Sequence, residues 1–184
     1  MQNLLLIKIM RFFLEHPYRE IYLRELAREL KLSPYAVKKY VDLLIKENLI
    51  NETKKGNLRY LVANTNNLFF KYLKISLNIK LILNSGLIEF LKENIVNISS
   101  IILFGSLAKG EDTEKSDIDI VVIGEKKEKK YLDLEEFERK LKREIKPHIF
   151  SWSEWKKKAK EDKPFYYEVI IYGIPLYGEL PVVE

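Results

Sequence analysis

The chain has 184 residues, of which 47% are hydrophobic, so it can bury the core of one large domain or of two small ones. It contains no cysteine, which excludes a disulfide framework and a thiolate metal site. Charged residues interrupt its long apolar stretches, which predicts neither a signal peptide nor a membrane span and favours a cytoplasmic location. The abundance of Lys, Glu and Ile resembles the composition of heat-adapted, thermophile proteins.

The net charge of +5 is concentrated in the N-terminal part of the chain. Residues 1–80 carry 15 Lys and Arg against 7 Asp and Glu, whereas residues 81–184 carry 17 against 20. We therefore expect the two parts to face different partners. A basic part is typical of a protein that meets phosphate backbones, although a lysine-rich solvated surface has the same composition.

Three helical patterns follow one another at the start of the chain. The first covers residues 3–15 and ends at His16-Pro17, because the residue before a proline avoids the helical region. The second lies in "IYLRELAREL", where leucine and alanine recur at helical spacing. The third begins with Ser33 as its N-cap and Pro34 in its first turn. Its outer face would carry Tyr35, Lys38, Lys39, Asp42 and Lys46.

Two strand-like runs follow the third helix, in "LINETKKGNLRYLVAN". They flank Lys54-Lys55-Gly56-Asn57, which predicts a β-hairpin with a basic tip and a glycine suited to a tight turn. Helices followed by a basic hairpin, over residues 3–64, resemble the winged helix-turn-helix DNA-binding family.

This resemblance implies a module that binds double-stranded DNA through its third helix and its wing. The residues that would contact DNA are Tyr35, Lys38 and Lys39 at the major groove and, on the phosphates, Lys54, Lys55 and Arg59. Many such modules instead bind protein or only dimerise. In that case the tyrosine is a packing residue and the lysines are ordinary surface.

Residues 66–96 are helical in period, and Ser85-Gly86 predicts a break between a connecting helix and the first helix of the next domain. The connecting helix is apolar on more than one side, which predicts that it packs against a second copy in a homodimer. The expected organisation is a domain at 1–64, a connecting helix at 65–85 and a second domain at 86–184.

The stretch "FGSLAKGEDTEKSDIDIVV" carries the residues most suited to chemistry. Residues 98–104 form an apolar run that predicts a buried strand, and Gly105-Ser106 ends it. Glycine lets a backbone approach a ligand closely, and a serine hydroxyl can meet a phosphate. We expect Ser106 to cap a short helix that Gly110 closes.

Two carboxylates open the next strand-like run, "DIDIVVIG". Because alternate residues of a strand share a face, Asp117 and Asp119 would project the same way while Ile118 and Ile120 enter the core. Like charges placed side by side repel each other unless a cation lies between them. Magnesium, which takes oxygen ligands and keeps water and phosphate, suits this pair best.

A Gly-Ser turn, ten intervening residues and Asp-x-Asp are similar to the motif of the polymerase β-like nucleotidyltransferases, and the likeness extends over residues 86–178. The resemblance implies a small mixed sheet with flanking helices, so that the chain as a whole would be α+β. It also implies a nucleoside triphosphate, ATP by preference, and two Mg²⁺ ions. The implied site residues are Gly105, Ser106 and Lys109 for the nucleotide and Asp117 and Asp119 for metal binding and catalysis.

The family's third carboxylate is expected in "REIKPHIFSWSEW", where His148 takes the acidic position. Three interpretations stay open: His148 acts as a catalytic base, Glu144 reaches into the site, or the site binds nucleotide without efficient turnover. Ser151 and Glu154 have the spacing of a capping box and predict the start of another helix.

Two functions follow from this resemblance. The first is a DNA-binding protein that transfers AMP from ATP to a hydroxyl on a partner, since the family includes antitoxins that modify a HEPN-type toxin protein. The second is a transcriptional regulator without enzymatic activity, whose nucleotidyltransferase-like domain senses nucleotide or mediates dimerisation. The third-carboxylate departure favours the second, and the intact Gly-Ser and Asp-x-Asp residues favour the first.

Overall fold

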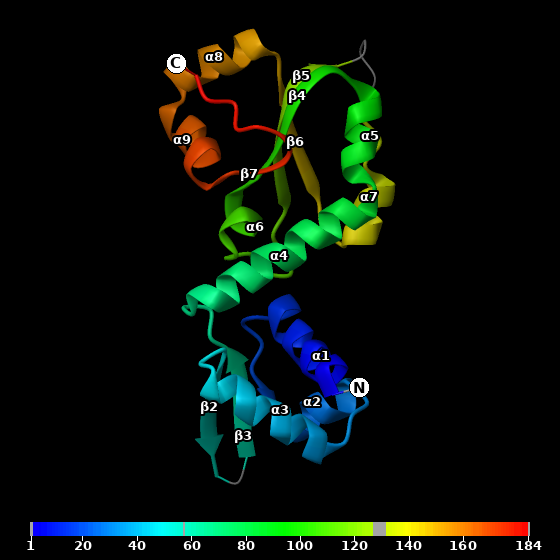
Figure 1. Cartoon of the computed structure of the whole chain (residues 1–184), viewed down its shortest axis with the longest axis vertical. Coiled ribbons are helices and arrows are strands. Elements are labelled where there is room, and N and C mark those ends of the chain that lie inside the picture. The colour runs from blue at the N-terminus through cyan, green and yellow to red at the C-terminus, as the bar shows by residue number, and fades with distance from the viewer. Residues whose placement is uncertain (1, 57, 127–131, 184) are drawn as a thin grey trace. The chain divides into compact units, whose positions relative to one another are not determined.

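The computed structural model describes residues 2–56, 58–126 and 132–183. The chain divides into two compact units, Met1–Lys74 and Ile75–Glu184. The division falls inside helix α4 (Leu68–Ser85), which is the helix predicted between the two parts of the chain (Figure 1). The domain limits themselves stay a prediction. No helix in the described ranges has the length and apolar character needed to cross a membrane.

The N-terminal unit combines short helices with an antiparallel sheet of strand order β1-β3-β2. Ser33 caps the third helix by accepting a hydrogen bond from the Ala36 backbone N–H at 3.2 Å, and Pro34 opens that helix, as predicted. Before α4, the elements of this unit are α1 (Gln2–Glu15), β1 (Ile21–Tyr22), α2 (Leu23–Glu29), α3 (Pro34–Lys46), β2 (Ile50–Lys55) and β3 (Leu58–Ala63).

The predicted β-hairpin is confirmed. Strands β2 and β3 pair antiparallel from Ile50 opposite Ala63 to Lys55 opposite Leu58. Asn57, predicted at the tip, lies outside the described residues. The winged-helix arrangement of these elements stays a prediction.

One hydrophobic core holds the N-terminal unit together. The helices contribute Phe13, Leu26 and Val37, and β3 contributes Leu61, all of them fully buried. Burying a side chain of this size contributes about 1.5–3 kcal/mol before entropy is counted. The outer face of α3 remains in solvent, with Tyr35 81% exposed, as the helical pattern predicts.

The C-terminal unit contains a mixed sheet of strand order β6-β5-β4-β7, in which β5 and β6 are parallel and the other pairs antiparallel. The predicted α+β class with a small mixed sheet is therefore confirmed. Its elements after α4 are α5 (Leu87–Asn94), β4 (Ile95–Phe104), α6 (Gly105–Lys109), β5 (Ile118–Lys126), α7 (Glu135–Leu141), β6 (Ile145–Phe150), α8 (Trp152–Glu161), α9 (Lys163–Tyr172) and β7 (Ile174–Gly178).

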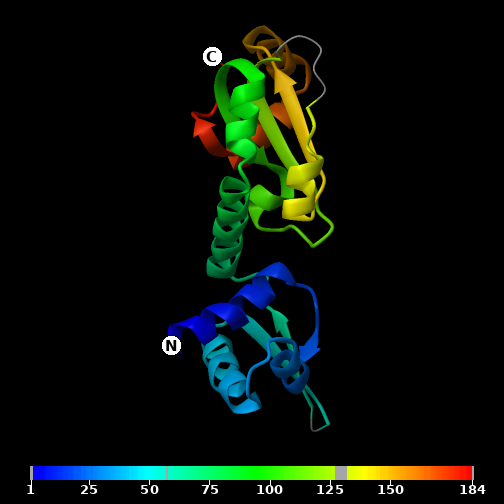
Figure 2. The ribbon, with the colours of Figure 1, turned by 90° about the vertical axis from the view of Figure 1, so that its right-hand side faces the viewer.

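Helices cover both faces of this sheet (Figure 1, Figure 2). Ile118 and Ile120 of β5 belong to the core that α5 and α7 cover. Val121, from the alternate positions of the same strand, belongs to the core with Trp155 of α8 and Val169 of α9. The alternation along β5 therefore assigns Asp119 to the face that carries α8 and α9.

Local signals set the helix boundaries in the C-terminal unit. Gly86, with φ +86°, separates α4 from α5, as predicted. Ser151 and Glu154 form the predicted capping box at the start of α8. The two edge strands of the described sheet each contain a proline, Pro147 in β6 and Pro175 in β7. Proline removes a backbone donor, so these edges are poor templates for adding another strand.

Candidate functional site

The Gly-Ser turn lies at the end of β4. Gly105 has φ +72°, a left-handed conformation that side chains disfavour, and a Cβ added there would lie 2.7 Å from Asp119 Oδ2. Two features therefore favour glycine at this position: the left-handed backbone angle, and the Asp119 carboxylate, which leaves no room for a Cβ. Gly110, with φ +67°, closes α6 as predicted.

The predicted cap of this helix is wrong. Helix α6 begins at Gly105, its N-cap is Phe104, and no side chain bonds to the cap. Ser106 consequently lies within the first turn, one position beyond the Gly105 that starts the helix. The left-handed glycine lets the backbone turn directly from strand to helix without a serine cap. Ser106 is half-buried beside the carboxylates' strand.

Asp117 and Asp119 lie at the start of β5. Asp119 pairs in register with Phe104 of β4 on one side and with Lys146 of β6 on the other, and Asp117 directly precedes the strand. Ile118 is fully buried on the opposite face. The sheet thus holds the carboxylates beside the Gly-Ser turn, because β4 and β5 are neighbours.

Burial raises the pKa of the Asp119 carboxyl, and the negative charge of Asp117 raises it further. The positive fields of His148 and Lys146 act in the opposite direction and lower it. The net effect is a raised pKa. A negative charge on Asp119 is therefore costly unless a cation lies close by.

Lys146 provides one such cation, and the sequence analysis missed it. Its ammonium donates a hydrogen bond to Asp117 Oδ2, and this bond and the charge of Asp117 raise the pKa of Lys146. The register of β6 against β5 brings Lys146 opposite Asp119. A signal existed in the alternation of "IKPHIF", but the register between two strands separated by a helix cannot be read from the sequence.

His148 lies two residue pairs further along β6 than Lys146, opposite Val121. Its exposed ring contacts Phe104 and Phe165, each with ring centroids 5.6 Å apart. The residue in register beside Asp119 is therefore Lys146, and the assignment of the family's acidic position to His148 stays a prediction. His148 remains near enough for its charge to act on Asp119, and its catalytic role stays a prediction.

Glu144 and Lys109, two further residues that the sequence analysis named for the site, both make contacts within the C-terminal unit. The Glu144 backbone carbonyl accepts a hydrogen bond from the Ile118 N–H at 2.8 Å, and its side chain is exposed. Lys109 Nζ lies 2.6 Å from Glu168 Oε1 and 4.8 Å from the ring centre of Tyr172. Lys109 thus ties α6 to α9, and contact with a phosphate would compete with Glu168.

A hydrogen-bonded network fixes the loop between α6 and the carboxylates. Asp112 is 1% exposed; its Oδ1 accepts from Asn78 Nδ2 at 2.9 Å and its Oδ2 from Arg143 Nη2 at 2.8 Å. Arg143 Nη1 also donates to the backbone carbonyls of Thr113 and Ser116, both at 2.7 Å. These residues, which the sequence analysis did not single out, position the backbone that leads into Asp117.

The two carboxylates suit one divalent cation. Carboxylate oxygens are ligands that Mg²⁺ accepts. In this structure the positive charge next to Asp117 is the ammonium of Lys146. Among the residues that the structure describes, no group of three or more His, Cys, Asp or Glu could hold a metal ion. Two carboxylates are enough to ligate a divalent ion whose other positions are taken by water or phosphate.

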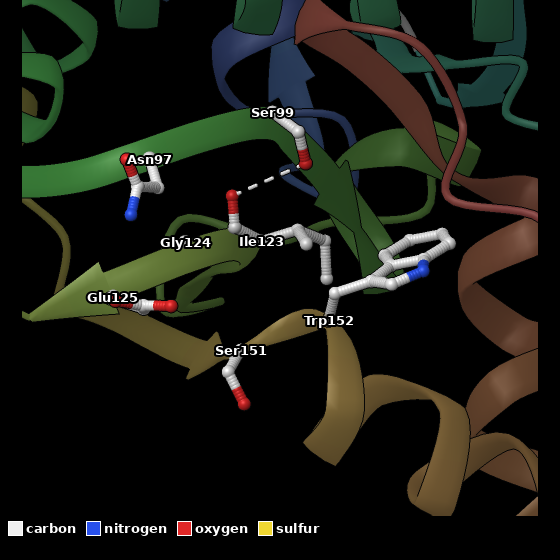
Figure 3. A pocket seen from close by; sticks show the side chains of 7 residues that line it. All are labelled: Asn97, Ser99, Ile123, Gly124, Glu125, Ser151 and Trp152. Atoms are coloured by element: carbon white, nitrogen blue, oxygen red, sulfur yellow. Dashed lines mark hydrogen bonds between the residues drawn. The ribbon is translucent and has the colours of Figure 1, made fainter.

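A separate pocket of about 330 Å³ lies toward the other end of β5, where Ile123, Gly124 and Glu125 follow the core positions of the strand (Figure 3). Ser99 Oγ donates a hydrogen bond of 3.5 Å to the Ile123 carbonyl in its wall. None of the predicted site residues lines it.

The predicted DNA contacts lie on two elements of the N-terminal unit. Lys38 and Lys39 are exposed on α3 with Tyr35. On the hairpin, Lys54 is exposed, whereas two other predicted contacts already have acidic partners. Those ion pairs are Lys55 with Glu20 at 3.1 Å, and Arg59 with Asp42 at 2.6 Å and with Glu52. Contact with phosphates stays a prediction for all six.

Comparison with known proteins gave matches to solved structures and to a family model. A crystal structure described as a toxin-antitoxin with AMP-PNP matches with 23% identity and a TM-score of 0.38, over 52% of this chain and 73% of that chain. A mutant of the toxin-antitoxin MntA-HpeT matches with 21% identity and a TM-score of 0.38, over 50% and 71%. Scores in this range say nothing about substrate or partner.

A search of curated proteins found no match. The family model "Polymerase beta, Nucleotidyltransferase" matches residues 85–180, which include the Gly-Ser turn, both carboxylates and the whole sheet of the C-terminal unit. The chain belongs to the polymerase β nucleotidyltransferase family.

Proposed function

We propose that the chain is a nucleotidyltransferase that moves a nucleoside monophosphate from a triphosphate to a hydroxyl group of a separate acceptor. The observation that carries the proposal is the packing of Gly105 against Asp119, with Asp117 beside it. A backbone without Cβ and an acidic pair meet there, which suits a phosphate chain and its metal ion. The family match over residues 85–180 supports the reaction class.

Each residue of this site has a proposed part in the transfer. Asp117 and Asp119 hold Mg²⁺, which when bound supplies positive charge to the triphosphate. The Gly105 backbone and the Ser106 hydroxyl orient the phosphates. The acceptor oxygen forms a bond to the α-phosphorus, the bond from that phosphorus to the β-phosphate oxygen breaks, and pyrophosphate leaves. His148 takes the proton of the acceptor hydroxyl.

The finer assignments rest on the family resemblance alone. ATP as the donor, AMP as the transferred group and a HEPN-type toxin protein as the acceptor are predictions that the geometry of this site neither requires nor opposes. A homodimer through α4 is a separate prediction that comes from the apolar character of this helix, and the exposed side chains of Leu68, Phe69 and Tyr72 support it.

We also propose that the N-terminal unit is a winged helix that binds double-stranded DNA. The exposed lysines of α3 and the basic hairpin support this assignment. The excess of positive charge in residues 1–80 favours association with phosphate backbones.

A regulator without enzymatic activity is the second candidate. The observation in its favour is Lys146, a cation where an acidic residue would help to bind metal. In that case the C-terminal unit binds nucleotide as a signal, and no label passes from α-labelled ATP to an acceptor.

Calorimetric titration of ATP, with and without Mg²⁺, tests the site. Wild type is expected to bind ATP in a metal-dependent way, and the double variant Asp117→Asn, Asp119→Asn to bind at least about tenfold more weakly, because the metal ligands are lost. The control Glu89→Gln, Glu161→Gln removes two exposed carboxylates of the same unit. Equal binding in all three proteins would contradict the assignment of the carboxylates.

A further inference from the structure

Lys146 places a positive charge beside the two carboxylates, Asp117 and Asp119. Lys146 lies opposite Asp119 on the parallel strand β6, so its side chain shares the face of the sheet on which Asp119 lies. Its ammonium donates a hydrogen bond to Asp117 Oδ2. The lysine is therefore in contact with one carboxylate and in the field of the other.

A protonated lysine and a divalent ion compete for this position. The ammonium is a donor only, so it cannot ligate a metal, and it occupies Asp117 Oδ2, an oxygen that could otherwise ligate a divalent ion. Repulsion between the two cations adds to this competition. The Lys146 side chain is 45% exposed on a flexible stem, so it can move away when a stronger cation arrives.

We propose that Lys146 is an internal counter-cation of the carboxylate pair, which takes the place of a second metal ion and limits the free site to one weakly bound divalent ion. The inference rests on the proposed function in one respect, since it takes Asp117 and Asp119 as the metal ligands. It adds a metal stoichiometry and names the residue that sets the affinity.

An ordinary surface ion pair is the alternative. Exposed pairs of this kind contribute little to stability, and their loss has no specific effect on metal binding. A counter-cation behaves differently, because its removal leaves two like charges unbalanced and open to a metal ion. Metal affinity therefore distinguishes the two roles where stability does not.

The test is a titration of the full chain with Mn²⁺ alone, with free Mn²⁺ followed by electron paramagnetic resonance. Wild type is expected to bind one ion weakly, and Lys146→Met to bind it about fivefold or more tightly. Lys146→Asp places a carboxylate beside Asp119 and is expected to bind more tightly still, with a second ion at high Mn²⁺. Thermal unfolding without metal checks that each variant is folded.

Lys115→Met is the matched control. Lys115 is exposed, carries the same charge and lies two residues before Asp117, so its loss is expected to change Mn²⁺ affinity by less than about twofold. Equal affinities in wild type and Lys146→Met, or an equal gain in the control, would overturn the role of Lys146 while leaving the metal site intact. No Mn²⁺ binding by any variant would instead count against the proposed metal site and, with it, this inference.

Discussion

At the scale of single residues, Gly105 is the position that the site tolerates least. Gly105→Ala must accept a left-handed φ and displace Asp119, whose Oδ2 would lie 2.7 Å from the new Cβ. We expect the variant to lose about 2 kcal/mol of stability and about tenfold in metal-dependent ATP affinity. Urea unfolding and calorimetry measure the two effects.

Gly56 is a matched control for this prediction. It has φ +60°, and a Cβ added there has nothing within 4 Å. Gly56→Ala therefore meets only the backbone cost, about 1 kcal/mol, and should bind ATP as wild type does. If Gly105→Ala also kept wild-type ATP affinity, the closeness of the turn to Asp119 would have no functional meaning.

At the scale of elements, the loop between α6 and β5 depends on the network around Asp112. Arg143→Met removes the guanidinium that bonds the buried Asp112 carboxylate, which is expected to destabilise the C-terminal unit by about 2–4 kcal/mol. Adding Asp112→Asn removes the negative charge that Arg143 balanced, so the double variant is expected to recover part of the loss. Urea unfolding measures both variants.

Arg139→Met is the comparison for this effect. It removes the same side chain from the exposed surface of α7, where a change of less than about 0.5 kcal/mol is expected. Hydrogen exchange across residues 111–118 should rise in Arg143→Met and stay unchanged in Arg139→Met. An Arg143→Met protein with wild-type exchange in this loop would show that the network does not hold it.

The sequence predicts the elements well where the signal is local. Ser33 as a cap, Gly86 as a break and the capping box at Ser151 each depend on neighbours within four residues. The cap predicted at Ser106 was wrong by two positions, because Gly105 itself starts the helix and Phe104 is the N-cap. Lys146 and Arg143 could not be predicted, since their roles depend on strand register and on contacts across about 30 residues of chain.

At the scale of the whole molecule, the two units carry charges of opposite sign. Met1–Lys74 carries 14 Lys and Arg against 7 Asp and Glu, whereas Ile75–Glu184 carries 18 Lys and Arg against 20 Asp and Glu. Electrostatic attraction of nucleic acid is therefore expected to act on the first unit, whereas the carboxylates of the second require a cation before they can approach a phosphate. The two proposed functions should respond to different substitutions.

The double variant Lys38→Ala, Lys39→Ala distinguishes DNA binding by the first unit from nucleotide binding by the second. Its affinity for a mixed-sequence DNA duplex is expected to fall, and the slope of log K against log salt to decrease by up to about 2, because two phosphate contacts are lost. Metal-dependent ATP binding should stay at the wild-type level. Fluorescence anisotropy at several salt concentrations gives the slope.

The control removes the same charge from the other unit, by Lys156→Ala and Lys160→Ala on the exposed surface of α8. Because net charge falls equally in both proteins, a general charge effect would lower DNA affinity equally in both, whereas contacts from α3 lower it only in the first. Equal slopes for wild type and the α3 variant would exclude those lysines as phosphate contacts. If DNA binding persisted, the hairpin would be the next surface to test, because Lys54 is exposed there, whereas Lys55 and Arg59 would first have to leave their acidic partners.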